Sequence, residues 1–207
     1  MSDAGAGDKR PGRRRREPFP DIERIAEPFP VPLTIGVVSD THVGRRGGRA
    51  LPPQIPALFR RMGVGVIAHA GDVNVPEALA SLAEVAPTLT VRGNNDWGFD
   101  EGALPDRIDF AVGRFRFALV HGQQLGTANR TARSLVGTVD CVIFGHSHKP
   151  GIVLEDGTIL FNPGSPTDRR WNPHFGVGLI RVDAERIDPE LILFSRPDEL
   201  DRIEPAG

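Results

Sequence analysis

The chain contains a single cysteine, Cys141, among its 207 residues, so no disulfide can form within it. A lone thiol is typical of proteins that work in a reducing compartment, and we therefore expect a cytoplasmic location. Cys141 begins the apolar run Cys141-Val-Ile-Phe144. That setting predicts a buried, unreactive thiol rather than a nucleophile.

The sequence also lacks the roughly 20 consecutive apolar residues that a membrane-spanning helix requires. The arginine run Arg13–Arg16 is followed by Glu-Pro-Phe-Pro instead of an apolar segment, so we expect neither a signal peptide nor a membrane partner. The formal net charge is only -2, so no overall basic field indicates a nucleic-acid partner. The length and the 39% hydrophobic content suit one domain with a full core.

Residues 1–32 are rich in glycine, proline and charge, and Glu-Pro-Phe-Pro occurs in them twice. Proline blocks helical and sheet hydrogen bonds, so we predict a disordered tail here. The alternative is a docking arm for a protein partner, in which Arg13–Arg16 contact an acidic surface or nucleic acid while Phe19 or Phe29 packs on the body. We place the folded domain at residues 33–196 and a second, loose tail at 197–207.

The first half of the domain alternates buried strands and helices. Apolar runs at 33–39, 64–68 and 88–91 predict strands, and the segments 53–62 and 76–85 between them predict helices. This alternation predicts a βαβαβ unit with a parallel sheet.

The second half reads differently. We predict a hairpin over 107–112 and 114–120, a helix over 127–136 and a strand over 140–144. A further hairpin turns at Asp156-Gly157, and strands near 176–182 and 187–194 end the domain. Together the two halves predict an α/β fold, a four-layer α-β-β-α sandwich in which two mixed sheets are flanked by helices.

Five short motifs follow these strands in order. Each lies directly after a predicted strand, where ligands bind in open α/β sheets. Glycines within the motifs permit the sharp turns that bring loops together. The motifs are Asp40-Thr-His42, Gly71-Asp72, Gly93-Asn94-Asn95-Asp96, His121-Gly122 and Gly145-His146-Ser-His148. They supply the carboxylate, amide and imidazole ligands that a pair of divalent ions needs, and paired ions indicate phosphate-ester hydrolysis.

With these motifs the chain resembles the calcineurin-like metallophosphoesterases, in particular their small single-domain bacterial and archaeal phosphodiesterase branch. The resemblance runs from about Leu33 to Val182 and includes the loop Asn162-Pro-Gly-Ser165. It implies two divalent metal ions, manganese first, with iron, zinc, nickel or cobalt as alternatives.

The resemblance also implies a role for each ligand. Asp40, His42 and His148 would bind the first ion. Asn94, His121 and His146 would bind the second ion, and Asp72 would bridge both. A hydroxide shared by the ions would attack a small phosphodiester in line with the leaving group. Asn94 and His121 would also contact the phosphate.

Asn95 departs from the pattern of the family. Many members carry a histidine there that is thought to protonate the leaving group, whereas an amide does not titrate near neutral pH. We therefore expect Asn95 to hydrogen-bond the phosphate and Asp96 to orient it. Asn94, Asn95, Asp96 and His121 are the candidate catalytic residues.

Two histidines and two aromatic residues have both a functional and a structural interpretation. His69 either supports a metal ligand or is a buried, hydrogen-bonded side chain. His174 either lies on the surface or supplies the missing proton. Trp97 and Phe99 either stack on a base or pack beside the site.

The arginines raise the same question. Arg169 and Arg170 follow the Asn162-Pro-Gly-Ser165 loop, and we take Arg169 as the candidate substrate contact, with a solvated face as the alternative. Arg45, Arg46 and Arg49 either line the entrance of the cleft or serve solubility.

Three functions are consistent with the sequence. A dinuclear phosphodiesterase acting on a small diester, such as a nucleotide, accounts for the complete ligand set. A weakly active or inactive scaffold in a protein complex accounts for Asn95 and the proline-rich arm. A nuclease ranks last because the body is acidic and no DNA-binding domain is evident. A homo-oligomer is left open.

Overall fold

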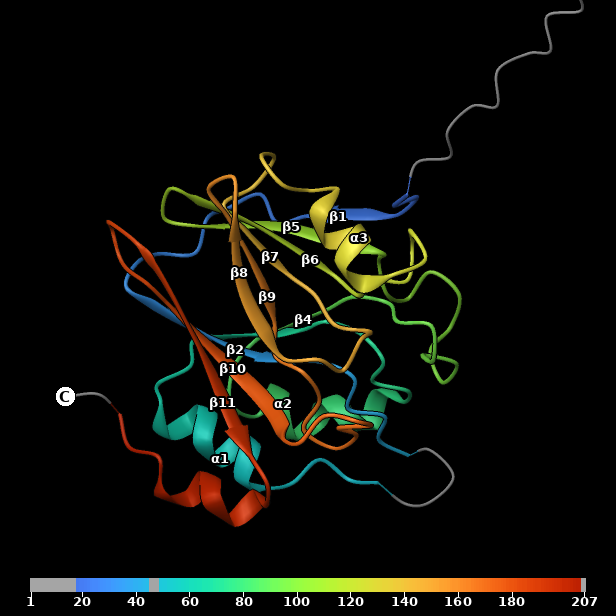
Figure 1. Ribbon diagram of the computed structural model, residues 1–207, viewed down its shortest axis with the longest axis vertical. Coiled ribbons are helices and arrows are strands. Elements are labelled where there is room, and N and C mark those ends of the chain that lie inside the picture. The colour runs from blue at the N-terminus through green and yellow to red at the C-terminus, as the bar shows by residue number, and fades with distance from the viewer. Residues whose placement is uncertain (1–17, 45–48, 206–207) are drawn as a thin grey trace, which may run out of the picture.

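Two mixed β-sheets face each other with helices on their outer sides, as the computed structural model shows for residues 18–44 and 49–205 (Figure 1). The predicted sandwich of two mixed sheets is confirmed. One sheet has six strands, in the order β1 (Ile22–Arg24), β5 (Arg107–Val112), β6 (Phe115–Val120), β7 (Cys141–Ile143), β9 (Thr158–Asn162) and β8 (Gly151–Glu155). The other has five, in the order β11 (Ile187–Phe194), β10 (Phe175–Val182), β2 (Leu33–Val38), β3 (Val66–His69) and β4 (Thr88–Thr90).

Strands β2, β3 and β4 form the parallel unit that the apolar runs predicted. Successive side chains of a strand point to opposite faces. In β2, Ile35 and Val37 therefore enter the core between the sheets, whereas Val38 meets the helices outside. Gly36 also faces outward, and a Cβ atom there would lie 3.0 Å from the ring of Phe59, so glycine lets the helix approach closely.

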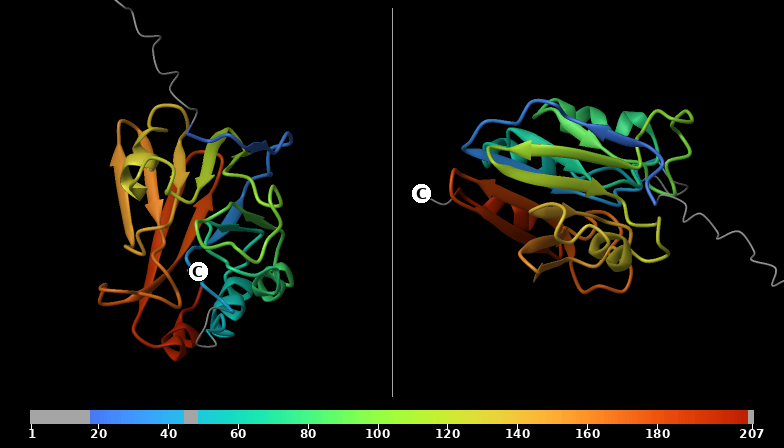
Figure 2. Two further views of the ribbon diagram at one scale, coloured as in Figure 1. Left: turned by 90° about the vertical axis from the view of Figure 1, so that its right-hand side faces the viewer. Right: turned by 90° about the horizontal axis from the view of Figure 1, so that it is seen from above.

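The helices cover both outer faces. The outer face of the five-stranded sheet carries α1 (Gln54–Arg61), the 3₁₀ turn η1 (Pro76–Leu79), α2 (Ala80–Ala83) and η2 (Pro197–Arg202). On the opposite side of the sandwich, α3 (Ala128–Arg133) covers the six-stranded sheet (Figure 2). The helix predicted over 76–85 begins as a 3₁₀ turn at Pro76 and is shorter than expected. None of the helices in these ranges is long and apolar enough to cross a membrane.

Residues 18–32 do not form the tail that the sequence predicted. Strand β1 pairs in parallel with β5, and Phe29 forms a bridge with Val112. Phe19 is only 4% exposed, and the guanidinium of Arg107 lies over its ring, 5.6 Å from the ring centre. The prolines do not prevent this pairing because β1 contains none and lies at the edge of its sheet. The arginine run of the predicted docking arm lies outside the described residues.

The C-terminal segment is likewise more ordered than predicted. Leu200 in η2 is fully buried against the helical layer. The guanidinium of Arg61 in α1 donates hydrogen bonds to the carbonyls of Leu200 (2.6 Å) and Ile203 (2.9 Å). These contacts fix η2 on the fold, so the domain extends past residue 196.

Candidate metal centre

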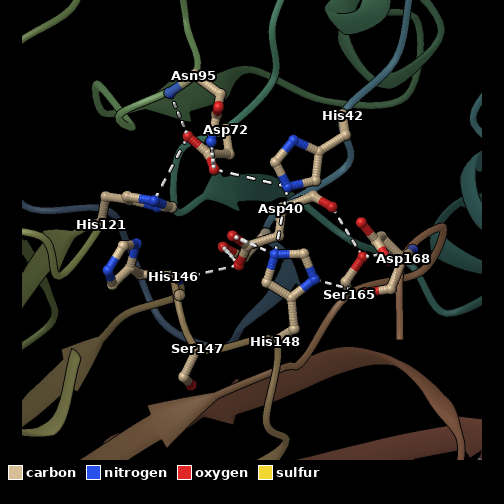
Figure 3. Close-up of polar contacts among 12 residues, drawn as sticks. Asp40, His42, Asp72, Asn95, His121, His146, Ser147, His148, Ser165 and Asp168 are labelled. Carbon is tan, nitrogen blue, oxygen red and sulfur yellow. Dashed lines mark hydrogen bonds and ion pairs between the residues drawn. The ribbon is translucent and has the colours of Figure 1, made fainter. Parts of the chain in front are cut away.

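The predicted ligands come from loops at the carboxyl ends of five strands, drawn from both sheets. Asp40 and His42 follow β2, Asp72 follows β3 and Asn94 follows β4. His121 follows β6, and His146 and His148 follow β7. Figure 3 shows the histidine and aspartate side chains of this set gathered in one region between the loops.

The backbone at these positions is unusual. Five of the predicted ligands have positive φ angles, a conformation that costs non-glycine residues about 1–3 kcal/mol each. They are Asp40 (54°), His42 (47°), Asp72 (58°), His146 (66°) and His148 (56°). The surrounding loops must hold this geometry, and such strain commonly accompanies functional sites.

Two glycines allow the loops to approach each other. A Cβ atom on Gly93 would lie 2.2 Å from Oδ1 of Asp72, and one on Gly145 would lie 1.8 Å from Oγ of Ser39. No other residue fits at either position without moving these loops apart.

Asp40, His42 and His148 form the first group of potential ligand atoms, all within 4.8 Å of one another. Nε2 of His148 lies 3.2 Å from Nε2 of His42 and 3.2 Å from Oδ1 of Asp40. All three side chains are fully buried, and Oδ1 of Asp40 has no hydrogen-bond partner. A buried acceptor without a partner is costly unless a cation satisfies it.

Hydrogen bonds on the far side of each ring determine which nitrogen faces this group. Nδ1 of His148 donates to the carbonyl of Asp168, and Nδ1 of His42 contacts the side-chain oxygen of Asn74 at 3.3 Å. Since these oxygens only accept, the Nε2 atoms of the neutral rings carry lone pairs. Two lone pairs and a carboxylate oxygen therefore converge, which is the donor set of a divalent metal.

Asp72 and His121 form a second group together with Asp40, which both groups share, and Asn94 lies beside it. Nε2 of His121 lies 3.5 Å from Oδ1 of Asp72 and 3.3 Å from Oδ1 of Asn94. The other oxygen of Asp72, Oδ2, lies 3.5 Å from Nε2 of His42. Asp72 thus presents one oxygen to each group, which is the arrangement of a bridging carboxylate.

His146 lies at the margin of this second group. Its ring packs edge-on against that of His121, with 5.1 Å between the centres, and its backbone N–H donates to Oδ2 of Asp40 at 2.9 Å. Among the described residues, neither compact cluster of potential ligands contains His146. The structure therefore brings six of the predicted ligands together and places the seventh beside them.

The electrostatics of the group favour charged carboxylates. Burial works against ionisation, but hydrogen bonds from His121 and Asn95 hold the pKa of Asp72 well below its usual range. Burial alone would lower the pKa of His121, yet its bond to Asp72 and the charge of Asp40 raise it to about 9. Without a metal, His121 is therefore the cation that balances these carboxylates, and a bound cation would replace its proton.

Asp96 has a different role from the one predicted. Its side chain accepts backbone N–H bonds from Gly93 (2.6 Å), Asn74 (2.7 Å) and Asp72 (3.1 Å). A carboxylate engaged with three backbone donors ties two ligand loops together. Asp96 is a positioning residue, and its carboxylate makes no hydrogen bond to the Asn95 side chain.

Asn95 binds the bridging carboxylate directly. Its backbone N–H donates to Oδ1 of Asp72 at 2.8 Å, and its side-chain amide donates to Oδ2 at 2.7 Å (Figure 3). In this conformation the amide group orients Asp72.

The structure also resolves the histidine and aromatic alternatives. His69 is fully buried, and burial lowers its pKa to about 3. Its Nε2 lies 3.0 Å from Oγ1 of Thr41, the residue between the predicted ligands Asp40 and His42. It is both a core side chain and a support of the ligand loop. His174 is exposed and contacts Ser195. Trp97 is 66% exposed and Phe99 is half-buried, so Trp97 lies largely outside the core.

The two arginines after the Asn162-Pro-Gly-Ser165 loop differ. The guanidinium of Arg169 donates to the carbonyls of Asn172 and Pro173, both at 3.0 Å, and lies over the ring of Phe175. Arg170 is exposed, and burial, the charge of His121 and, more weakly, the charge of Arg170 lower the pKa of His146. The charge of Arg170 therefore acts weakly on His146.

The remaining arginines are also placed in part. Arg49 forms an ion pair of 2.6 Å with Asp168, the residue whose carbonyl accepts from His148. Arg45 and Arg46 lie outside the described residues.

Sequence reasoning missed several supporting residues. Ser39 donates to Oδ2 of Asp40 at 2.7 Å, and Ser165 donates to its carbonyl at 2.7 Å. Asn74, which orients His42, lies two residues after Asp72, just as His42 lies two residues after Asp40. That repeated spacing was the sequence feature that could have identified Asn74 as a supporting residue.

Comparison with known proteins agrees with this geometry. Residues 33–185 match the calcineurin-like phosphoesterase superfamily domain. A probable metallophosphoesterase of Methanothermobacter thermautotrophicus is 34% identical over 168 residues, which cover 80% of this chain and 95% of the relative. The chain belongs to the calcineurin-like phosphoesterase superfamily.

Two further proteins extend the comparison of this metallophosphoesterase. A phosphodiesterase of Methanocaldococcus jannaschii is 26% identical over 144 residues, covering 64% of this chain and 83% of the relative. The crystal structure of Vps29 from Entamoeba histolytica, complexed with zinc, has a TM-score of 0.63 at 23% identity and covers 79% of this chain and 100% of Vps29. The second likeness establishes the fold alone.

Proposed function

We propose that this metallophosphoesterase is a dinuclear enzyme that hydrolyses a small phosphodiester, with nucleotide diesters as the first class to examine. The observation that carries the proposal is the position of Asp72, whose two oxygens each lie 3.5 Å from a histidine of a different ligand group. One carboxylate between two donor sets is what a pair of neighbouring ions requires.

The ligand atoms divide between two sites. Asp40, His42 and His148 would hold one ion, and Asn94 and His121 would hold the other, with His146 completing that set. Two divalent ions would supply positive charge to the phosphoryl oxygens and lower the pKa of water, and manganese is our first choice among them.

The surrounding residues position this centre. The Asp168 carbonyl fixes the ring of His148, and the Ala70 carbonyl accepts from Nδ1 of His121 at 2.6 Å. Both rings therefore present Nε2 before any ligand arrives, which lowers the reorganisation needed in the reaction. Asn95 holds the carboxylate of Asp72 between the two groups.

The charges near the centre favour a diester. A phosphodiester carries a single negative charge at neutral pH, and the exposed guanidinium of Arg170 adds a positive charge that acts weakly on His146. Asn95 offers no titratable proton, so we expect the enzyme to prefer diesters whose leaving group departs without protonation.

Hydrolysis of bis(p-nitrophenyl) phosphate and of p-nitrophenyl phosphate, with and without Mn²⁺, tests the proposal. We expect Mn²⁺-dependent cleavage of the diester, lost in Asp72→Asn and retained in Asp188→Asn, a matched change at an exposed position on β11. Arg170→Met should raise KM about tenfold with little change in kcat, because it removes one charge-assisted contact, whereas Arg169→Met should not.

The same measurements separate the second candidate, a weakly active or inactive scaffold, which the missing proton donor at Asn95 favours. If calorimetry shows that Mn²⁺ binds at two sites while neither ester is cleaved, the enzymatic proposal is wrong and the scaffold takes its place. Cleavage that persists in Asp72→Asn would overturn the assignment of the site.

A further inference from the structure

Strand β8 has one free edge. It is the outermost strand of the six-stranded sheet, and its hydrogen bonds to β9 occupy only one side. The two-residue turn Asp156-Gly157 has φ angles of 48° and 76°, so the flanking pair Glu155 and Thr158 exchanges hydrogen bonds. Because such pairs alternate along a hairpin, Ile152 and Leu154 point their N–H and C=O groups away from β9.

The side chains along this edge are apolar and exposed. Ile152 is 40% exposed, Val153 48% and Leu154 72%. Three consecutive exposed apolar residues on a strand with one free edge form a surface that readily pairs with another strand.

The other sheet edges are protected. Strands β1 and β4 have only three residues each. Strand β11 is longer, but it carries Pro189 between Asp188 and Glu190, and proline and charge both discourage pairing. Among the edge strands that the structure describes, β8 is thus the one of at least five residues whose central residues include neither a proline nor a charged side chain.

The apolar surface continues onto the second sheet. Strand β11 contacts β8, and Leu193 on β11 is 46% exposed. Leu191, two residues earlier on the same face, borders the core between the sheets, as does Ile159, the partner of Leu154. Ile152, Leu154 and Leu193 therefore form a patch where the core reaches solvent at the open side of the sandwich.

We propose that a second copy of this chain covers this patch, with the two β8 strands paired antiparallel about a two-fold axis at Val153. In this register Ile152 of one copy faces Leu154 of the other, and the outward N–H and C=O groups of both pairs are satisfied. The two six-stranded sheets become one continuous sheet, and apolar side chains pair across the junction.

Charge at the two ends of β8 selects this occupant. The exposed cation Lys149 precedes the strand, and the exposed carboxylate of Asp156 follows it. Glu155, the last residue of the strand, already forms an ion pair of 2.8 Å with Arg133 of its own chain. Antiparallel pairing places Lys149 of each copy beside the acidic turn of the other, whereas parallel pairing would bring like charges together. The interface is therefore self-complementary in backbone, apolar contacts and charge.

The mass in solution, measured by light scattering with size-exclusion chromatography at micromolar concentration, tests the pairing. We expect a dimer for the wild type and a folded monomer for Leu154→Lys, with the same far-UV circular dichroism spectrum because the Leu154 side chain points to solvent. The melting temperature of the wild type should exceed that of the variant and rise with concentration, since dimerisation stabilises the folded state. Trp171→Lys, which changes an apolar side chain that is 99% exposed elsewhere, should remain a dimer.

Cross-linking tests the register. The two Val153 residues form a non-hydrogen-bonded pair with Cα atoms about 4.5 Å apart, which is within the range of a disulfide. Val153→Cys should therefore give a covalent dimer on mild oxidation, and Ile152→Cys should not, because its partner is Leu154. Cys141 is fully buried and does not interfere.

A monomeric wild type would overturn the proposal and leave the edge for a different protein. A dimer that survives Leu154→Lys, or that Val153→Cys fails to cross-link, would overturn it as well by placing the interface elsewhere. None of these three results depends on hydrolytic activity or on the metal.

Discussion

At the scale of single residues, Asn95 is the position at which the proposed reaction lacks a proton donor for the leaving group. Its amide and backbone N–H both donate to Asp72, at 2.7 and 2.8 Å, so it stabilises the ionised carboxylate and has no proton to transfer. A general acid in this position typically contributes about 10²–10⁴-fold to the rate.

Asn95→His should therefore raise kcat by about 10²-fold for a diester with an alkyl leaving group. It should change kcat much less for bis(p-nitrophenyl) phosphate, since p-nitrophenolate leaves without protonation. Steady-state kinetics on the two substrates measure the ratio, and Asn95→Gln serves as a control of side-chain size without a titratable group. Equal changes on both substrates would contradict this role.

Arg169 and Arg170 show how little sequence adjacency says about side-chain function. The guanidinium of Arg169 donates to the carbonyls of Asn172 and Pro173, whereas Arg170 is exposed. The backbone of Arg170 has a positive φ of 49°, which turns successive side chains in different directions. Local sequence cannot show which carbonyls a folded loop presents.

At the scale of elements, the segment before β2 belongs to the fold. Phe19 fills the layer between the six-stranded sheet and α3, where its neighbours include Ala118 and Val142. Its ring also lies under Arg107. A tail would leave the Phe19 ring in solvent, whereas the fold buries it. This burial holds the segment that begins at residue 18 on the six-stranded sheet.

Phe19→Ala should accordingly lower the free energy of unfolding by about 3–5 kcal/mol, as expected for an aromatic side chain removed from a core. Urea denaturation followed by circular dichroism measures the change. Trp171→Ala, at a side chain that is 99% exposed, should alter stability by less than about 0.5 kcal/mol. A loss at Phe19 as small as that at Trp171 would show that the segment contributes nothing to stability.

The elements that the sequence predicted well are those with strong local patterns. The strands 107–112 and 115–120, the turn at Asp156-Gly157 and α1 all appear close to their expected bounds. Apolar periodicity and turn chemistry are properties of adjacent residues, so they are visible without the fold. The ordered ends were missed because their stability comes from long-range burial.

At the scale of the whole molecule, buried histidines couple stability to pH. Burial lowers the pKa of His69 to about 3, so below pH 6.5 the unfolded chain binds a proton that the native state excludes. Stability then falls as the pH drops. His121 has the opposite sign, because Asp72 and Asp40 raise its pKa to about 9 against the effect of burial. The stability that protonated His121 contributes is complete below pH 6.5 and is lost as the pH rises toward 9.

The metal-free protein should therefore be most stable near pH 6.5 and lose stability on both sides, by about 1.4 kcal/mol per pH unit for each proton. Urea unfolding in EDTA from pH 4.5 to 9 measures this profile. His69→Gln should reduce the slope of the acid side and leave the basic side unchanged, while the lowered pKa values of His42 and His146 keep a smaller acid slope. His174→Gln, at an exposed position, should change neither side. A flat acid side in the wild type would refute the assignment.

The sequence by itself determined the succession of strands along residues 33–196, the family and the set of residues at the strand ends, because strand patterning and motif chemistry are local. The roles of those residues in binding metal remain predictions, but six of the seven expected ligands converge. Only the tertiary structure decided that Asp96 braces loops, that His146 stands at the margin and that β8 is left uncovered. Each of these depends on which distant backbone groups and surfaces meet, and burial of that kind is set by the packing of the whole chain.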